Sequence, residues 1–235
     1  MNSGGGDGKA RDVRVLYHQP LSPQCRKVRL VLQEKRIPFD LRSEAVWERR
    51  EAFVALNPAC TVPVLVDENE AVVADSYAIC EYLDEAYPNT PQLLGRSHTE
   101  RAEIRRLVAW FDGKFDREVT RNLLHEKQFK RLLRQGSTSG EALRAGYTNL
   151  RGHMEYLGWL AESRRWLAGP ELSLADLAAA AHLSALDYIG DLDWSLSAPV
   201  REWYARIKSR PSFRPLLADR VSAIDPPAHY ADLDF

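Results

Sequence analysis

The sequence predicts a small α/β layer followed by an all-helical region. Over residues 13–88, short apolar runs of strand length alternate with helical segments, and two of these runs form a hairpin pattern. From residue 98 onward only helical periodicity remains. The 235 residues suit one large or two modest domains, and 45% hydrophobic with 28% charged residues is typical of a globular protein with a core.

Composition excludes several classes of function. The net charge of −1 gives no case for nucleic acid or membrane binding, and no apolar run approaches the ~18 residues needed to span a bilayer. Residues 1–11 are Gly-rich and polar without an apolar stretch, so we interpret them as a disordered tail rather than a signal peptide. The three cysteines, Cys25, Cys60 and Cys80, lack metal-ligand spacing and suit a reducing cytoplasm, so no metal site is expected.

The α/β domain, residues 12–88, is delimited by turn and cap signals. Ser22 resembles an N-cap with Pro23 at the first helical position, and Asp75-Ser76 opens the last helix, which ends near residue 87. Between these signals the pattern has the order β-α-β-α-β-β-α. The expected strands are Val13–Tyr17, Phe39–Leu41, Val64–Val66 and Ala71–Val73, and the first two helices are residues 23–35 and Trp47–Leu56.

The helical domain is expected over residues 98–221, after a linker at Pro88–Ser97. Its first segment, residues 98–134, is long enough to need a bend or break, for which Gly113 is a candidate. Ser173 and Asp176 have capping-box spacing before the almost wholly apolar segment 174–185, which should be buried on most sides. Both residues are therefore interpreted as structural. The other expected helices are residues 142–161, 200–208 and 213–220, and residues 222–235 are expected to form an extended tail.

Four motifs in this order resemble the cytosolic glutathione transferase superfamily. They are Asn57-Pro58, Val62-Pro63-Val64-Leu65, Asp75-Ser76 and Ser173-Leu174-Ala175-Asp176. The resemblance implies a thioredoxin-like N-terminal domain, an all-helical C-terminal domain and a homodimer. It also implies that Pro63 is cis and that the Val62 backbone faces the cysteinyl unit of glutathione.

The chemistry of that implied site stays open between two interpretations. Ser22 either stabilises a glutathione thiolate or only caps its helix. Asp75 and Ser76 either hold the γ-glutamyl end of glutathione or cap the next helix. Cys60 stands where the family commonly has glycine. It could block glutathione, form a mixed disulfide with it, or be a small buried residue, and it puts efficient glutathione use in doubt.

Three further segments carry a narrower resemblance. Trp47–Arg50, Trp110–Val119 and His229–Phe235 are similar to a family of FtsZ-binding, transferase-like division proteins of alphaproteobacteria. This implies a cytoplasmic adaptor at the division site, with FtsZ and other division proteins as partners, no cofactor and no significant transferase activity. The alternative is an enzyme that conjugates glutathione to small electrophiles through Ser22, Val62, Asp75 and Ser76.

Candidate partner-binding residues lie in three places. Residues 114–134 contain seven basic and three acidic side chains, which form either a solvated helix face or a docking surface for an acidic partner. Trp47 is an anchor if it is exposed and a core residue if it is buried. The C-terminal tail is either disordered or a short docking peptide. The partner-binding candidates are Trp47, Lys114, Arg117, Arg121, Lys127, Asp232, Asp234 and Phe235.

Overall fold

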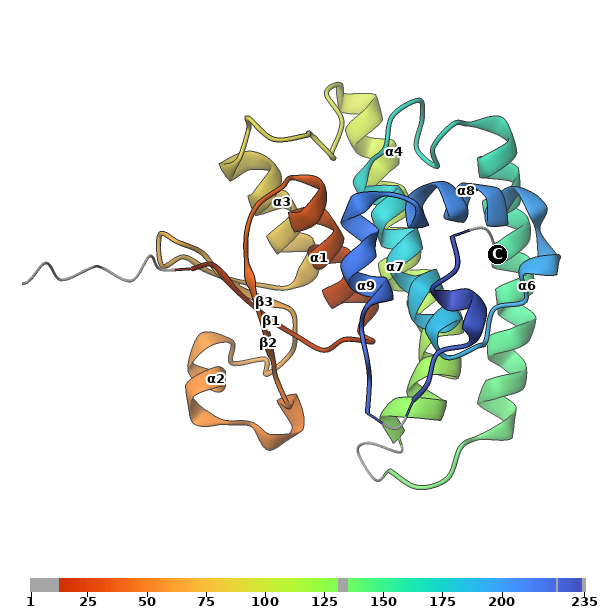
Figure 1. The fold of residues 1–235 in the computed structure, drawn as a ribbon, viewed down its shortest axis with the longest axis horizontal. Coiled ribbons are helices and arrows are strands. Elements are labelled where there is room, and N and C mark those ends of the chain that lie inside the picture. The colour runs from red at the N-terminus through yellow and green to blue at the C-terminus, as the bar shows by residue number, and fades with distance from the viewer. Residues whose placement is uncertain (1–12, 131–134, 223, 234–235) are drawn as a thin grey trace, which may run out of the picture.

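The computed structural model describes residues 13–130, 135–222 and 224–233. An α/β unit and a helical unit lie side by side in it (Figure 1). The α/β unit consists of β1 (Val15–His18), α1 (Pro23–Glu34), β2 (Asp40–Ser43), η1 (Val46–Glu48), α2 (Glu51–Leu56), β3 (Val64–Val66), β4 (Val72–Ala74) and α3 (Ser76–Ala86). The predicted β-α-β-α-β-β-α order is therefore confirmed, and the unit has the thioredoxin-like fold.

The four strands form one sheet in the order β2-β1-β3-β4. β1 runs parallel to β2 and antiparallel to β3, and β3 pairs with β4 as the predicted hairpin. Because side chains alternate along a strand, β1 supplies both faces of the sheet. Leu16 packs into the main core with α1 and α3, and Tyr17 packs against Phe53 of α2 on the other face.

Helix α1 begins where the sequence predicts. Ser22 has an extended backbone, its hydroxyl accepts the amide of Cys25 at 3.3 Å, and Pro23 occupies the first turn. The helix lies between the sheet and α7, so nearly all of its residues are buried, including its basic ones (Figure 1). The α/β unit is thus joined to the helical unit through α1.

The predicted continuous helix over Trp47–Leu56 is wrong. A 3-10 turn at Val46–Glu48 is followed by Arg49 in a left-handed conformation (φ 46°), and α2 starts only at Glu51. The turn lets the Arg50 guanidinium pair with the buried carboxylate of Glu44. Sequence periodicity cannot predict this ion pair. The turn that precedes it leaves the Trp47 side chain exposed.

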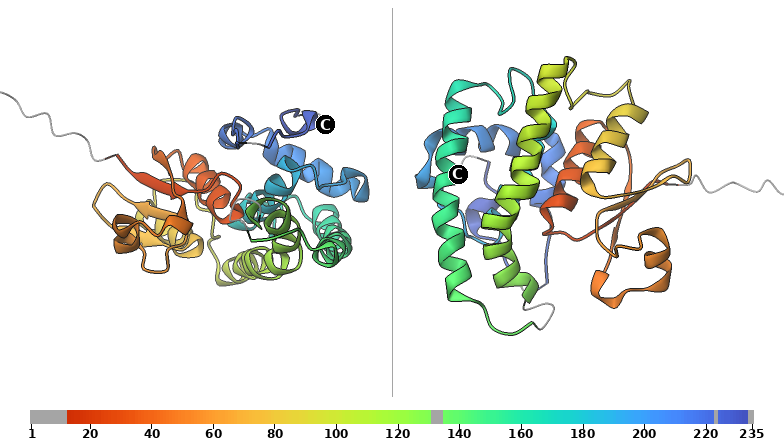
Figure 2. Two further views of the ribbon diagram at one scale, coloured as in Figure 1. Left: turned by 90° about the horizontal axis from the view of Figure 1, so that it is seen from below. Right: turned by 180° about the vertical axis from the view of Figure 1, so that it is seen from behind.

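The helical unit packs long antiparallel helices around a buried central one, α7 (Figure 2). Its elements are α4 (His98–Ala109), η2 (Trp110–Phe129), α6 (Gly140–Ser163), α7 (Leu174–Tyr188), η3 (Trp194–Leu196), α8 (Ala198–Lys208), η4 (Pro211–Phe213), α9 (Arg214–Leu217) and η5 (Ala228–Tyr230). Within the described ranges, each helix is too short or too polar to cross a membrane.

The first segment was expected to bend or break, with Gly113 as a candidate, and the chain is not broken there. At Trp110 the chain passes without interruption from α4 into η2, whose wider π-helical pattern continues to Phe129. A Cβ atom at Gly113 would meet nothing within 4 Å, so this glycine serves neither a turn nor a close approach. The end of the expected segment, residues 131–134, lies outside the described residues.

Helix α7 is buried along its whole length, and its start carries the capping box that the spacing predicts. One oxygen of Asp176 accepts the Ser173 amide and hydroxyl, each at 3.0 Å. The other accepts the Leu167 amide at 2.8 Å and the Trp203 indole N–H at 3.0 Å. Asp176 therefore holds the start of α7, a preceding loop and α8 together.

The C-terminal tail is not simply extended. Residues 228–230 form the turn η5, which places Tyr230 fully inside the helical unit. Its ring packs edge-on against Tyr188, and its hydroxyl donates to the Leu216 carbonyl at 3.1 Å. Burial of this aromatic ring draws the tail back onto the core. Asp234 and Phe235 lie outside the described residues, and Asp232 is exposed.

Candidate functional site

A cavity of about 250 Å³ lies between the two units, at the N-terminal end of α1. Its wall includes residues from the α/β unit and from η2: Ser22, Gln24, Cys60, Val62, Asp116, Thr120 and Arg121. Ser22 and Val62, which were predicted to share a site, are brought together here. Gln24, Asp116 and Thr120 were not identified from the sequence, because single polar residues inside helices carry no local signal of a pocket.

The Val62-Pro63 peptide bond is cis, as the family resemblance implied. Val62 is half-buried at the cavity and Pro63 is buried behind it. Cys60, two residues earlier, has φ 52°, a left-handed conformation that glycine adopts most readily. Its buried thiol donates to the Val46 carbonyl at 3.2 Å. The side chain is therefore held against the turn that carries Trp47.

Asp75 and Ser76 do not line this cavity. Asp75 (φ 78°) is the exposed N-cap of α3, and one of its carboxylate oxygens accepts the amides of Tyr77 at 2.7 Å and Ala78 at 3.3 Å. Ser76 is buried in the first turn. The structure thus shows the capping role of Asp75, whose carboxylate accepts the first amides of α3.

A second cavity, of about 490 Å³, opens beside the first. Its wall is mainly apolar and includes Pro20, Leu21, Trp47, Phe129, Val221 and Ile224. Trp47 is 44% exposed, so the condition under which it was predicted to be an anchor is met. Phe129 lines both cavities, which makes them neighbouring parts of one interdomain groove.

The basic candidates on η2 fall into two groups. Lys114 pairs with Glu118 and lies over the Trp110 ring, and Lys127 pairs with Asp191. These two ammonium groups are therefore committed to neighbours in the helical unit, Lys127 to a carboxylate 64 residues away. Sequence reasoning, which counted all the basic residues as one face, did not detect this.

Arg117 and Arg121 form the second group, which faces outward. Arg117 is exposed. The Arg121 side chain is 73% exposed, although its Nε donates to the Asp116 carboxylate at 2.7 Å. Exposed arginines on η2, of which Arg121 lines the smaller cavity, suit an acidic or phosphate-bearing partner group.

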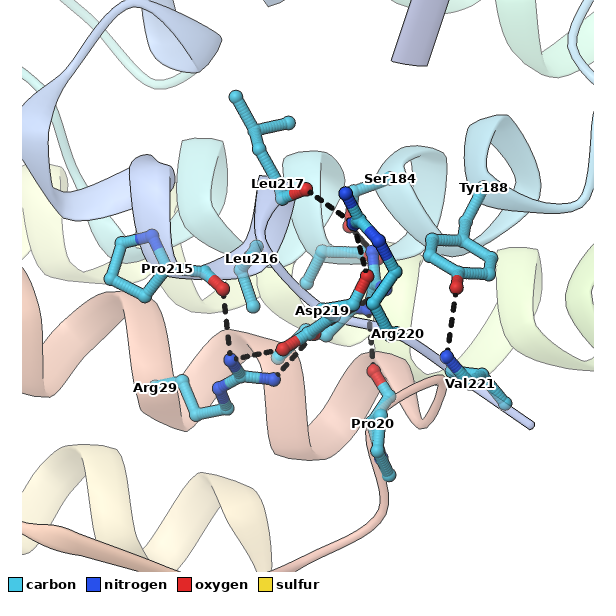
Figure 3. Close-up of polar contacts among 12 residues, drawn as sticks. Pro20, Arg29, Ser184, Tyr188, Pro215, Leu216, Leu217, Asp219, Arg220 and Val221 are labelled. Atoms are coloured by element: carbon cyan, nitrogen blue, oxygen red, sulfur yellow. Dashed lines mark hydrogen bonds and ion pairs between the residues drawn. The ribbon is translucent and has the colours of Figure 1, made fainter. Parts of the chain in front are cut away.

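Buried ion pairs fix the two units around the groove. Arg29 of α1 donates from both terminal nitrogens to the two oxygens of Asp219, each at 2.8 Å (Figure 3). Arg26 binds the Pro20 carbonyl at 2.7 Å, and its other contacts include the Tyr230 hydroxyl at 3.1 Å. Because Pro20 lines the apolar cavity, the same contacts position its wall.

A second buried pair joins Lys27 of α1 to Asp112 of η2. Burial disfavours both charges, yet their mutual attraction outweighs it, so the pKa of Lys27 is raised and that of Asp112 is lowered. His18, beside the arginines of α1, has its pKa lowered to about 4 by burial and by Arg29. Among the described residues, no group of three or more His, Cys, Asp or Glu side chains is placed to hold a metal ion.

Comparisons with known proteins agree with this architecture. A family model of the glutathione S-transferase N-terminal domain matches residues 16–91. The solved structure of a glutathione S-transferase from Rhodospirillum rubrum F11 is 53% identical, with a TM-score of 0.92, over 94% of this chain and 100% of that one. The chain therefore belongs to the glutathione transferase superfamily.

Within that superfamily the chain is similar to an FtsZ-localized protein. FtsZ-localized protein A of Caulobacter vibrioides is 50% identical over 225 residues, which cover 94% of this chain and 98% of that protein. The solved structure of FzlA from C. crescentus is 50% identical, with a TM-score of 0.91, over 95% of this chain and 100% of that one. The narrower resemblance predicted from three short segments is thereby confirmed.

Proposed function

We propose that this protein is an adaptor of bacterial cell division that binds FtsZ filaments at the division site through its interdomain groove. Similarity to FtsZ-localized protein A over nearly the full length of both chains carries the proposal. The groove adds physical support, because an exposed tryptophan at the edge of an apolar cavity is a typical anchor for protein binding.

The proposed contact surface combines Trp47 with the outward arginines of η2. Trp47 and the apolar cavity would bury an apolar side chain of the partner. Arg117 and Arg121 would contribute attraction to acidic groups at the rim, which affects association rate and salt dependence more than it affects affinity. Lys114 and Lys127 are expected to contribute less, because their paired side chains are only 42% and 30% exposed, whereas that of Arg121, which also pairs with a carboxylate, is 73% exposed.

Co-sedimentation with assembled FtsZ tests this proposal. We expect the wild-type protein to pellet with filaments at micromolar concentration, and Trp47→Ala to weaken binding by roughly 30-fold, as for an anchor worth about 2 kcal/mol. Trp159→Ala is the matched control, because Trp159 is 56% exposed and belongs to α6, a helix that lies away from α2 and the sheet (Figure 1). Wild-type protein that stays in the supernatant refutes the adaptor proposal, and equal losses in the two variants refute the role of Trp47.

A glutathione-conjugating enzyme is the second candidate. It is supported by the cavity that holds Ser22 beside the cis Val62-Pro63 turn, and by the likeness to the R. rubrum transferase structure. Asp75 supports it less, since its carboxylate already accepts the first amides of α3. Calorimetric titration with glutathione separates the candidates. Micromolar affinity favours the enzyme, and millimolar affinity or none excludes it.

We also propose that the protein is a homodimer. Val72 on β4, the edge strand of the hairpin, and Tyr77 on α3 are exposed apolar side chains on neighbouring elements. Such a pair suits a contact between two copies of the α/β unit. Light scattering coupled to size-exclusion chromatography measures the mass directly, and a mass of 26.7 kDa, that of one chain, at micromolar concentration would contradict the dimer.

A further inference from the structure

Gln24 connects the two units across the small interdomain cavity. Its amide nitrogen donates to the Asp116 carboxylate of η2 at 3.3 Å, and its amide oxygen lies 3.2 Å from the Ser22 hydroxyl. The other oxygen of Asp116 accepts from Arg121. All four side chains line the same cavity, so a chain of polar contacts runs along its wall from Ser22 to Arg121.

The hydrogen bonds between Ser22, Gln24 and Asp116 have one consistent assignment of donors and acceptors. A carboxylate paired with arginine only accepts, so the Gln24 NH₂ group must face Asp116 and its oxygen must face Ser22. The Ser22 hydroxyl therefore donates its single proton to Gln24. It already accepts the Cys25 amide at 3.3 Å as the helix cap. Both functions of the hydroxyl are thus used within the protein.

A glutathione thiolate in this cavity would need that proton. A serine hydroxyl stabilises a thiolate by donating a hydrogen bond to it, since sulfur offers only an acceptor. On the same wall Asp116 is paired with Arg121, so this ion pair adds little net charge near the thiol, and the Ser22 proton is the deciding contact. The hydrogen bond from Ser22 to Gln24 therefore disfavours the ionised thiol of glutathione in this cavity.

We propose that Gln24 is a positioning residue that withholds the Ser22 hydroxyl from thiol ligands and so suppresses glutathione chemistry in this fold. The inference rests on the proposed adaptor function, because it explains how a retained transferase pocket is kept inactive. Removing the Gln24 side chain leaves the Ser22 cap in place and frees the hydroxyl to donate into the cavity.

The test is a gain of function in Gln24→Ala. The probe is glutathione with 1-chloro-2,4-dinitrobenzene, whose conjugation forms a carbon–sulfur bond, breaks the carbon–chlorine bond and releases chloride and the thiol proton. We expect kcat/KM and glutathione affinity to rise about fivefold to tenfold, the effect of one hydrogen bond. The ultraviolet absorbance of the bound thiolate should then develop at lower pH than in the wild type.

Two further variants distinguish positioning from a general loosening of the pocket. In Ser22→Ala/Gln24→Ala the gain should vanish, and Gln92→Ala, at an exposed glutamine outside this cavity, should match the wild type. An unchanged Gln24→Ala, a gain that persists without Ser22, or a wild type already as active as Gln24→Ala overturns the inference. Failure of wild-type FtsZ co-sedimentation refutes only the adaptor function, so the two results are separable.

Discussion

Replacement of Asp176 by alanine should test most directly how the helical unit is held together. The carboxylate is fully buried and accepts four hydrogen bonds, from Leu167, Trp203 and, twice, Ser173. Alanine removes all four acceptor contacts at once. The three N–H donors are fixed by the backbone or by the indole ring, so they cannot turn to other partners, whereas the Ser173 hydroxyl can rotate.

The expected loss follows from those three donors. A buried donor without a partner costs about 1–3 kcal/mol, which gives a loss of roughly 3–9 kcal/mol before compensation. Burial raises the pKa of Asp176, so the ionised carboxylate itself costs stability, and its removal returns part of the loss. We therefore expect Asp176→Ala to lower the free energy of unfolding by about 3 kcal/mol.

Urea denaturation at pH 7, followed by tryptophan fluorescence, measures this change. Ser139→Ala is the control, because Ser139 caps α6 at a half-buried position and its hydroxyl accepts the Ala142 amide at 3.2 Å. It should cost about 1 kcal/mol. A loss below 1 kcal/mol for Asp176→Ala, with an unchanged m-value, would refute the reasoning from unsatisfied donors.

Two further predictions concern the junction of the units. Asp219→Asn leaves one oxygen and no charge for the buried Arg29, so it should lower the free energy of unfolding by about 1–3 kcal/mol; an unchanged denaturation midpoint would contradict this. His18 has its pKa lowered to about 4 by burial and the nearby arginines, so between about pH 6.5 and pH 4 the unfolded chain binds the additional proton. Stability should therefore rise with pH across this window, by up to about 3 kcal/mol. His18→Asn should flatten that dependence in urea denaturation at a series of pH values, whereas a control change at the exposed His98 should not; a slope retained in His18→Asn would exclude His18 as its source.

Local signals predicted most of the elements correctly. The Ser22-Pro23 start of α1 and the hairpin on either side of residues 67–70 were found because caps and turns depend on neighbouring residues. The helix expected from Trp47 failed because Arg49 adopts a left-handed conformation, and the resulting turn brings Arg50 to the buried carboxylate of Glu44. Helical periodicity reflects the spacing of apolar residues and cannot predict a turn or the ion pair that follows it.

The candidate site was predictable only in part. The family motif located Val62 and its cis bond, and the cap located Ser22, so two walls of the small cavity could be anticipated. Asp116 comes from a helix 92 residues beyond Gln24 in the chain, and only packing of the units brings the two side chains opposite each other. Asp75 lies at the start of α3 as its motif predicts, and its carboxylate accepts the first amides of that helix.

The sequence by itself determined the order of the strands and helices, the superfamily and the caps that begin α1, α3 and α7, because these depend on residues within a few positions of one another. It could not assign roles to Arg26, Lys27 and Arg29, which appear in the chain as a basic run beside the Ser22 motif. Only the tertiary structure buries them and pairs Arg29 with Asp219, 190 residues away. Desolvated charges require partners, and the partners become adjacent only when the two units pack.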